Sequence, residues 1–238
     1  MLSGMLIGGS HTLKATIVLT DDFETGAVNA NSPGAPINGL WTTPSIAGWT
    51  LGGTQEVTGT DAFSSPDGIY KNPHSGHITA AFFSSNNGAV STASIARDIT
   101  TTNAPGITYN LHFWISNPIA DINARQNLFS LTWDNALLNL STYDSRFKTP
   151  NPNPLANELP GGPNEFVLDP NTDWFEVSIS GLTASGSSTP LKFTAQNNNA
   201  ATLLDDVTVE QTPEPSTVVL LGAAAAFMGM RRKRRTVS

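Results

Sequence analysis

The sequence predicts an all-β protein in which two antiparallel sheets pack face to face. Between Thr16 and Gln211 there is almost no helical periodicity. Short runs of β-branched and aromatic residues recur instead, and glycine, asparagine, proline and serine separate them, which is the pattern of strands joined by turns. The low share of charged residues, 13%, together with the many turn formers, is typical of extracellular β proteins.

Ten runs have the length and composition of strands, and this many short strands fit two packed antiparallel sheets. They are Thr16–Thr20, Gly48–Leu51, His77–Phe83, Ala89–Ile99, Thr108–Ser116, Leu128–Trp133, Leu137–Thr142, Trp174–Ser180, Leu191–Ala195 and Leu203–Glu210. The fifth run alternates clearly: Tyr109, Leu111, Phe113 and Ile115 share one face, which we expect to fill the core, and Trp114 lies on the other.

Turn and loop signals divide these runs. Trp133-Asp134-Asn135 lies between two runs and predicts a tight hairpin turn. Asn29–Leu40 and Lys148–Pro163 are too rich in proline to form central strands, so we expect loops there. No linker or internal repeat divides the body, which indicates one domain over residues 16–211.

The end of the chain has a different character, because a Pro-Glu-Pro triplet, an apolar run and a basic cluster follow one another directly. Pro213 and Pro215, on either side of Glu214, lack N–H donors and interrupt regular structure. The run from Thr217 to Met230 carries no charge. A cluster of five cations ends it: Arg231, Arg232, Lys233, Arg234 and Arg235.

This apolar run predicts a transmembrane helix over residues 216–230. Fourteen helical residues span about 21 Å against a hydrocarbon core of about 30 Å, and snorkelling arginines with local bilayer thinning make up much of the difference. The positive-inside rule places the basic tail, residues 231–235, in the cytoplasm and the body across the membrane. The alternative, a buried core helix, leaves five adjacent cations unexplained.

These three signals, in this order and place, resemble the PEP-CTERM sorting signal, with Pro213, Glu214 and Pro215 as its motif. The resemblance implies that an exosortase, a membrane enzyme of Gram-negative bacteria, recognises residues 212–238. It also implies a protein that is tethered to the inner membrane with its body in the periplasm before processing. After processing it would be at the cell surface or outside the cell.

The N-terminal 15 residues resemble the end of a secretory signal peptide. An apolar stretch precedes a small residue at Ala15, but no positive segment comes first, so we expect a truncated signal peptide over residues 1–15. A disordered start is the alternative. The chain has no cysteine, so the stability of an exported body has to come from core packing or a bound ion.

The net charge of −7 conceals an asymmetry. Without the five tail cations, seven basic residues face 19 acidic ones, which leaves −12 on the rest of the chain. A body this acidic argues against nucleic acid or anionic lipid as a partner.

The body itself resembles jelly-roll domains of the carbohydrate-binding-module kind, which are galactose-binding-domain-like. The resemblance rests on the opening Asp21-Asp22-Phe23-Glu24-Thr25-Gly26, on the Tyr-x-Leu-x-Phe-Trp strand over 109–114, and on closing strands at 173–175, 191–193 and 203–209. It implies a structural Ca²⁺ held by Glu24 with Asp205 or Asp206. Carboxylate oxygens suit this ion, and the first and last strands of such a sandwich can lie side by side. The alternative is that these acids are solvated strand ends.

Exposed aromatic rings would be the means of binding a sugar, since sugar C–H faces pack on indole rings. Trp114, Trp133 and Trp174 are the candidates, and Trp114 is the most suggestive because it faces away from the predicted core. The alternative is that these rings merely fill the core or plug its ends.

Other groupings favour ordinary surface roles. His74-x-x-His77 has no third histidine or cysteine at a suitable spacing, so we interpret both as surface histidines. The acid pairs formed by Asp173 with Asp169 or Glu176 could flank a glycosidic bond, but nothing distinguishes them from solvated loop charges.

We therefore expect an exported, exosortase-processed surface or matrix protein that is not an enzyme and that associates with extracellular polysaccharide. A structural matrix protein with protein partners alone is the alternative, and a glycan hydrolase is a further one. Glycan binding rests here on likeness of fold.

Overall fold

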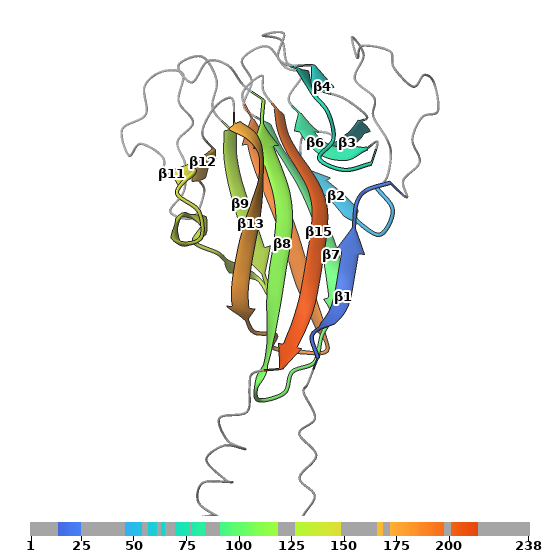
Figure 1. Cartoon of the computed structure of the whole chain (residues 1–238), viewed down its shortest axis with the longest axis vertical. Coiled ribbons are helices and arrows are strands. Elements are labelled where there is room, and N and C mark those ends of the chain that lie inside the picture. The colour runs from blue at the N-terminus through green and yellow to red at the C-terminus, as the bar shows by residue number, and fades with distance from the viewer. Residues whose placement is uncertain are drawn as a thin grey trace, which may run out of the picture.

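A computed structural model describes eleven segments of the chain, at residues 14–24, 46–53, 57–60, 63–64, 70–76, 78–83, 91–118, 127–148, 166–168, 172–197 and 201–213. They form a sandwich of two antiparallel sheets (Figure 1), as the sequence predicts. The front sheet of Figure 1 has the order β13 (Thr172–Leu182), β8 (Ile107–Asn117), β15 (Ala201–Pro213), β6 (Thr79–Phe83), β3 (Val57–Thr60), and β1 (Thr16–Asp21) pairs with β15.

The back sheet contains the intervening strands. Its order is β11 (Phe147–Lys148), β12 (Phe166–Leu168), β9 (Asn127–Trp133), β14 (Ser188–Asn197), β7 (Ser91–Thr100), β2 (Thr50–Gly53), and β10 (Ala136–Leu137) pairs with β9. A separate ribbon joins β4 (Phe63–Ser64) to β5 (Tyr70–Lys71). Because β6, β8, β13 and β15 lie in one sheet and β7, β9 and β14 in the other, the chain repeatedly crosses between the layers.

Alternating side chains build the core between the layers. In β8, Tyr109, Leu111, Phe113 and Ile115 have no exposed surface, which confirms the predicted inward face. Phe113 meets Phe193 of β14 at 5.2 Å between ring centroids, in an edge-to-face arrangement that aromatic pairs favour. Residues of both sheets therefore interlock across the sandwich, which fixes the outward face of β8 as well.

The first and last strands are neighbours, as expected. β1 pairs antiparallel with β15 from Thr16↔Gln211 to Asp21↔Val207. The pairing ends at Asp21↔Val207, so Asp22 and Glu24, which follow β1, continue toward Asp206 and Asp205 of β15.

The predicted hairpin turn is confirmed. Trp133 pairs with Ala136, so Asp134 and Asn135 form a two-residue turn, with φ angles of 51° and 63°. Positive φ at both positions is the signature of a type I′ turn, whose twist matches that of the strands.

One predicted strand is wrong. The run Leu137–Thr142 was expected to be extended, whereas the strand stops at Leu137 and a 3₁₀ turn, η1 (Leu140–Thr142), follows. The backbone N–H and the hydroxyl of Thr142 both donate to the carbonyl of Asn139, which closes the turn and buries Leu140. A polar side chain that bonds its own backbone competes in this way with sheet pairing.

Several expectations fall on residues outside the described segments: the signal peptide up to residue 13, the loops at 29–40 and 149–163, and the membrane helix with its basic tail at 216–235. Within the described residues, no helix is long and apolar enough to cross a bilayer.

Candidate functional site

The candidate site forms where β15 departs from regular pairing. Asp205 pairs with Trp114 and Thr208 with His112, so β15 has one more residue than β8 between these points. This is a β-bulge, and Asp206 within it has the unusual φ of +48°. The bulge directs two consecutive carboxylates toward the segment at 72–76, which follows β5.

Asp205 lies fully buried beneath this segment. Its Oδ2 accepts the backbone N–H of His74 (3.0 Å) and of Ser75 (3.3 Å), and its Oδ1 accepts the N–H of Asp206 (2.9 Å). Burial raises the pKa of this carboxyl to about 7, against the lowering effect of these N–H donors, and the neighbouring Asp206 charge adds to the rise. Asp205 is therefore a structural anchor for the segment.

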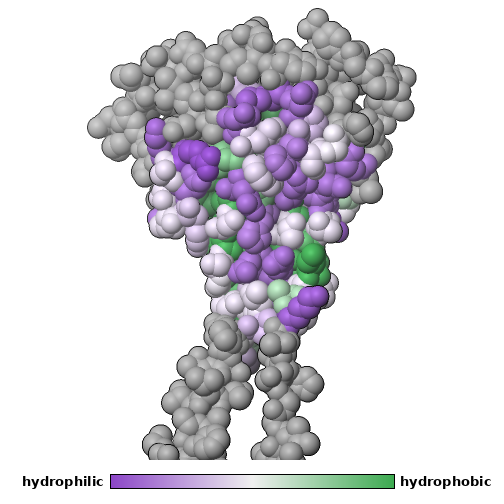
Figure 2. Space-filling model, viewed as in Figure 1, coloured by the Kyte–Doolittle hydropathy of each residue, from purple (hydrophilic) through white to green (hydrophobic). Residues whose placement is uncertain are grey.

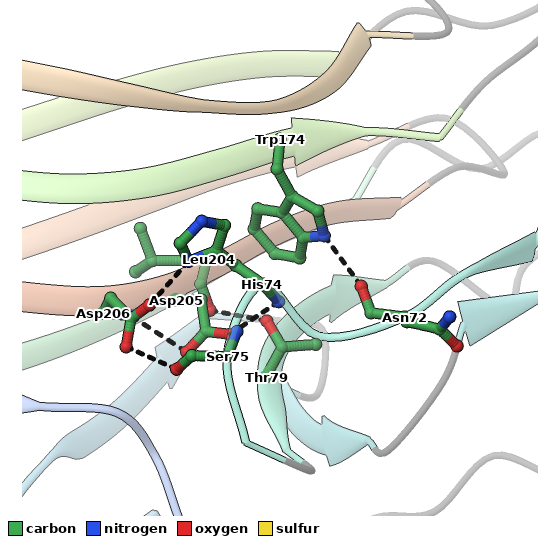
Figure 3. Close-up of polar contacts among 8 residues, drawn as sticks. All are labelled: Asn72, His74, Ser75, Thr79, Trp174, Leu204, Asp205 and Asp206. Atoms are coloured by element: carbon green, nitrogen blue, oxygen red, sulfur yellow. Dashed lines mark hydrogen bonds and ion pairs between the residues drawn. The ribbon is translucent and has the colours of Figure 1, made fainter.

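Asp206 holds the side chains of the same segment (Figure 3). Its Oδ2 lies 2.6 Å from Nδ1 of His74, and its Oδ1 accepts the hydroxyl of Ser75 at 2.7 Å. Thr79 donates its hydroxyl to the carbonyl of Leu204, the residue that precedes Asp205. The bulge thus fixes both the backbone and the side chains of residues 74 and 75 on the sheet.

His74 lies between two tryptophans. Its ring stacks on Trp114 with centroids 3.6 Å apart and planes at 14°, and it meets Trp174 edge-on at 6.0 Å. The indole N–H of Trp174 donates to the carbonyl of Asn72 at 2.7 Å (Figure 3). We call this group, made of His74, Trp114 and Trp174, the aromatic cluster. The interpretation of His74 as an ordinary surface histidine is wrong; His77 lies outside the described residues.

The aromatic cluster borders a polar surface. On the outward face of β8 and β13, His112 contacts Ser178 (3.0 Å) and Glu176 (3.3 Å) through Nδ1. At the cluster itself, Nζ of Lys71 lies 2.9 Å from Oδ1 of Asp173. Figure 2 shows this side of the molecule as largely hydrophilic where it is coloured. Partly buried aromatic rings and hydrogen-bonding groups therefore occur together on one side of the front sheet.

Of the three tryptophans singled out in the sequence, Trp133 lies elsewhere. Its side chain is 3% exposed, packs 5.6 Å from Tyr109, and donates its indole N–H to the carbonyl of Thr183. It is a core residue in this structure. Trp114 and Trp174 are the two that reach the outer side of the front sheet, both partly buried.

The predicted calcium ligands converge only in part. Glu24 reaches the other flank of the same loop, where its Oε1 accepts the N–H of Ile78 at 2.7 Å. Gly76, at φ +56°, lies so close that a side chain there would collide with the Glu24 carboxylate. Asp21 faces elsewhere, since its Oδ2 accepts from Trp49 (2.9 Å) and Arg97 (2.6 Å).

The side chains beside this loop offer the kind of oxygen ligand that Ca²⁺ prefers, but fewer of them than the six to eight that the ion takes. Glu24, Asp205 and Asp206 offer carboxylate oxygens, the hard ligands that this ion prefers: Asp205 and Asp206 lie beside His74, and Glu24 lies beside Ile78. Within the part of the chain that the structure describes, however, no three acidic or histidine side chains are placed to hold a metal together. Backbone carbonyls would have to supply the remaining ligands, so calcium stays a prediction.

The acidic pairs considered for hydrolysis are placed as follows. Asp173 is largely exposed, and its hydrogen bond from Lys71 lowers the pKa of its carboxyl, with a smaller contribution from the N–H of Trp174. Glu176 contacts His112, and Asp169 lies outside the described residues. A carboxyl with a lowered pKa is a poor general acid at neutral pH.

Sequence reasoning assigned His74 to the surface and missed its neighbours Asn72 and Ser75. Their partners lie far along the chain, 102 residues away for Asn72 and up to 132 for the others. A signal was nevertheless present, because the Pro-His-Ser-Gly stretch at 73–76 is a turn that could carry His74 back over the sheet.

Comparisons with known proteins bear on the C-terminal segment and on the fold. Residues 211–235 match the model of the PEP-CTERM protein-sorting motif. The PEP-CTERM identification is thus confirmed, with Gln211, Thr212 and Pro213 of the motif inside β15. No curated protein matches the chain.

Among solved structures, an apo cyclase from Fischerella sp. aligns with a TM-score of 0.50 at 10% identity, over 85% of this chain and 98% of the other. The CBM22-1 xylan-binding domain from Paenibacillus barcinonensis Xyn10C has a TM-score of 0.44 at 13% identity (85% and 97%). TmCBM61 in complex with β-1,4-galactotriose has 0.39 at 10% (68% and 88%). At these identities the likeness concerns the fold alone. The chain ends in a PEP-CTERM sorting motif.

Proposed function

We propose that this is an exported, exosortase-processed protein whose β-sandwich associates with extracellular polysaccharide through the aromatic cluster and has no catalytic role. Polysaccharide binding is inferred from the packing of His74 between Trp114 and Trp174 on the polar side of the front sheet. The sorting motif carries the export half. Each half can be tested without the other.

The export half follows from the order of segments. The motif continues directly from β15, so the domain would be held next to the inner membrane by the apolar run at 216–230, with the basic tail in the cytoplasm. Processing by the exosortase of a Gram-negative cell would then deliver the domain to the cell surface or the extracellular matrix.

The polysaccharide half rests on pre-organisation. The bond from Trp174 to Asn72 and the stacking of His74 on Trp114 fix the rings before a ligand arrives, which reduces the entropy lost on binding. Lys71, Asp173 and Asp206 lie around the rings and provide polar groups for sugar hydroxyls. Partly exposed aromatic rings edged by hydrogen-bonding groups suit a sugar, which has C–H faces and hydroxyl rims.

Binding of the full chain to polysaccharide from the producing organism's matrix tests this half. Trp174→Ala removes a ring of the cluster, and we expect the Kd to rise at least about tenfold, the usual cost of losing a buried aromatic anchor. Tyr143→Ala is the matched control, since Tyr143 is an exposed aromatic residue on a different element. Equal binding by wild type and Trp174→Ala, or no binding to any polysaccharide with calcium present, would contradict the proposal. Retention in insoluble matrix after glycan digestion would favour the protein-only alternative.

The non-catalytic assignment has its own test. A hydrolase that used Asp173 or Glu176 would release reducing ends from the bound polysaccharide. Turnover that disappears in Asp173→Asn or Glu176→Gln would overturn this part of the proposal.

We propose calcium as a structural partner of the segment at 72–76, held in part by Glu24 and Asp205, with Asp206 beside them. An ion that binds the folded state alone at a hundred times its Kd stabilises by about 2.7 kcal/mol, so EDTA should lower the Tm by several degrees. In Glu24→Gln, which keeps an oxygen to accept the Ile78 N–H, the response to EDTA should be much smaller. An identical Tm with calcium and with EDTA would rule the ion out.

A further inference from the structure

The last strand of the domain and the sorting motif share residues. The motif match begins at Gln211, whereas β15 ends at Pro213, so three residues belong to both. In the front sheet these residues pair with residues 107–109 of β8. The first proline of Pro-Glu-Pro is therefore a sheet residue, and no spacer separates the folded domain from the motif.

Side-chain contacts fasten this strand end from both edges. Thr108 and Thr212 each donate a hydroxyl to the other's carbonyl at 3.3 Å. On the opposite edge Gln211 pairs with Thr16 of β1. The hydroxyl of the fully buried Tyr109 donates to Oε1 of Gln211 at 3.5 Å. The start of the motif is thus tied to both neighbouring strands.

We propose that the enzyme that reads the motif binds it with Gln211–Pro213 peeled away from the front sheet, so that the end of β15 is a latch. An enzyme that holds Pro-Glu-Pro in a cleft needs the edges of this segment. In the folded domain β8 occupies one edge of Gln211–Pro213, and β1 occupies the other edge at Gln211. Strand ends open locally at little cost in free energy, so the peeled form is accessible. This inference rests on the proposed function, because it presupposes that the motif is processed.

The latch also orients the domain. The end of β15, the start of β8 and the start of β1 lie together at the lower end of Figure 1. The bulge at Asp205–Thr208 lies higher up on the same strand, and five to eight strand residues correspond to about 17–26 Å at 3.3 Å per residue. The lower end of the sandwich therefore meets the processing enzyme, while the aromatic cluster stays clear of it.

A disulfide that locks the strand end tests the latch. In Thr108→Cys/Thr212→Cys, the replaced hydroxyls lie 3.4 Å apart, and cross-strand neighbours on one face have Cβ separations close to those of a disulfide. The chain has no other cysteine. The control Thr100→Cys/Ser188→Cys links β7 to β14, at paired positions in the back sheet. Both pairs can oxidise after export.

Processing of the full chain is followed in the producing organism by the mass of its C-terminus. Because the peeled form is reached only by local opening, we expect the locked protein to be processed at least about tenfold more slowly than wild type, and the control at the wild-type rate. A third variant carries the lock together with an inserted Gly-Ser-Gly-Ser-Gln-Thr directly after position 212, which gives the motif its own free Gln-Thr. Wild-type processing of this variant would show that the lock acts through the strand.

The outcomes separate the two proposals. If wild type is processed and the locked protein is processed equally fast, the latch is refuted and the sorting function stands. Continued blockage in the spacer variant also refutes the latch, because the disulfide must then act in some other way. If wild type itself is never shortened, the export half of the proposed function fails and the latch fails with it.

Discussion

Asp205 is the residue on which the candidate site depends most. It is fully buried, and it accepts three backbone N–H groups, two of them from the segment that carries His74. Burial raises the pKa of its carboxyl to about 7, so the carboxyl is a costly choice for a core position. The three bonds explain why it is tolerated: they replace the water that the carboxylate loses.

Replacing Asp205 should therefore destabilise the protein through unpaired donors. For Asp205→Ala we expect a loss of about 3 kcal/mol in the free energy of unfolding, because buried N–H groups without an acceptor cost about 1–3 kcal/mol each and water can enter to relieve some of them. Urea unfolding measures the loss.

Asp205→Asn is the matched control, since it keeps the volume and one acceptor oxygen. It should lose less than half as much stability as the alanine variant. If the two variants lose the same amount, the hydrogen bonds to the segment contribute nothing and the anchor role is wrong.

At this scale the sequence predicted inward and outward faces well and the site poorly. The two-residue period of β8 was enough to assign Tyr109, Leu111 and Phe113 to the core and Trp114 to the outside. His74 could not be placed in the same way, because its partners come from β15 and β8 and no local pattern links them to it. Trp133 was expected to be a candidate for binding sugar but lies in the core. Its position there depends on packing against Tyr109 of the other sheet, which no local pattern indicates.

At the scale of elements, the long strands were predictable and the short ones were not. β8, β9, β13, β14 and β15 each contain the predicted run and extend it by a few residues at one or both ends. Short strands such as β3 and β11 depend on a neighbour that is already in place, β6 and β12 respectively, so their own sequence carries little signal. The tight turn after Trp133 was predictable because it depends only on its own two residues, Asp134 and Asn135, which tolerate positive φ.

That turn gives a prediction of its own. Asn135 has φ +63°, a conformation that asparagine and glycine tolerate and that β-branched residues do not. Asn135→Val should lower the stability by about 1–2 kcal/mol, the cost of a left-handed conformation for such a residue. Asn135→Gly, which suits a type I′ turn, should leave the stability near that of wild type. Thermal unfolding compares the two, and equal Tm values would contradict the turn geometry.

In the whole molecule, one strand links the proposed polysaccharide site to the sorting motif. β15 carries the bulge that builds the aromatic cluster and, at its other end, the first residues of the sorting motif. The sequence indicated both ends of this strand, through its Leu-Asp-Asp-Val stretch and its Pro-Glu-Pro triplet. It did not indicate the bulge, since an extra residue in a strand is defined only against its partner.

We propose that this domain leaves the cell by way of its C-terminal sorting motif. Intact-mass analysis of the protein from the cytosolic, membrane and extracellular fractions of the producing organism tests it most directly. We predict that the protein is recovered from the cell surface or the extracellular fraction as a chain shortened near Pro213–Pro215 and lacking the apolar run at 216–230. A soluble cytosolic chain that retains all of its last two dozen residues would contradict export by way of the sorting motif.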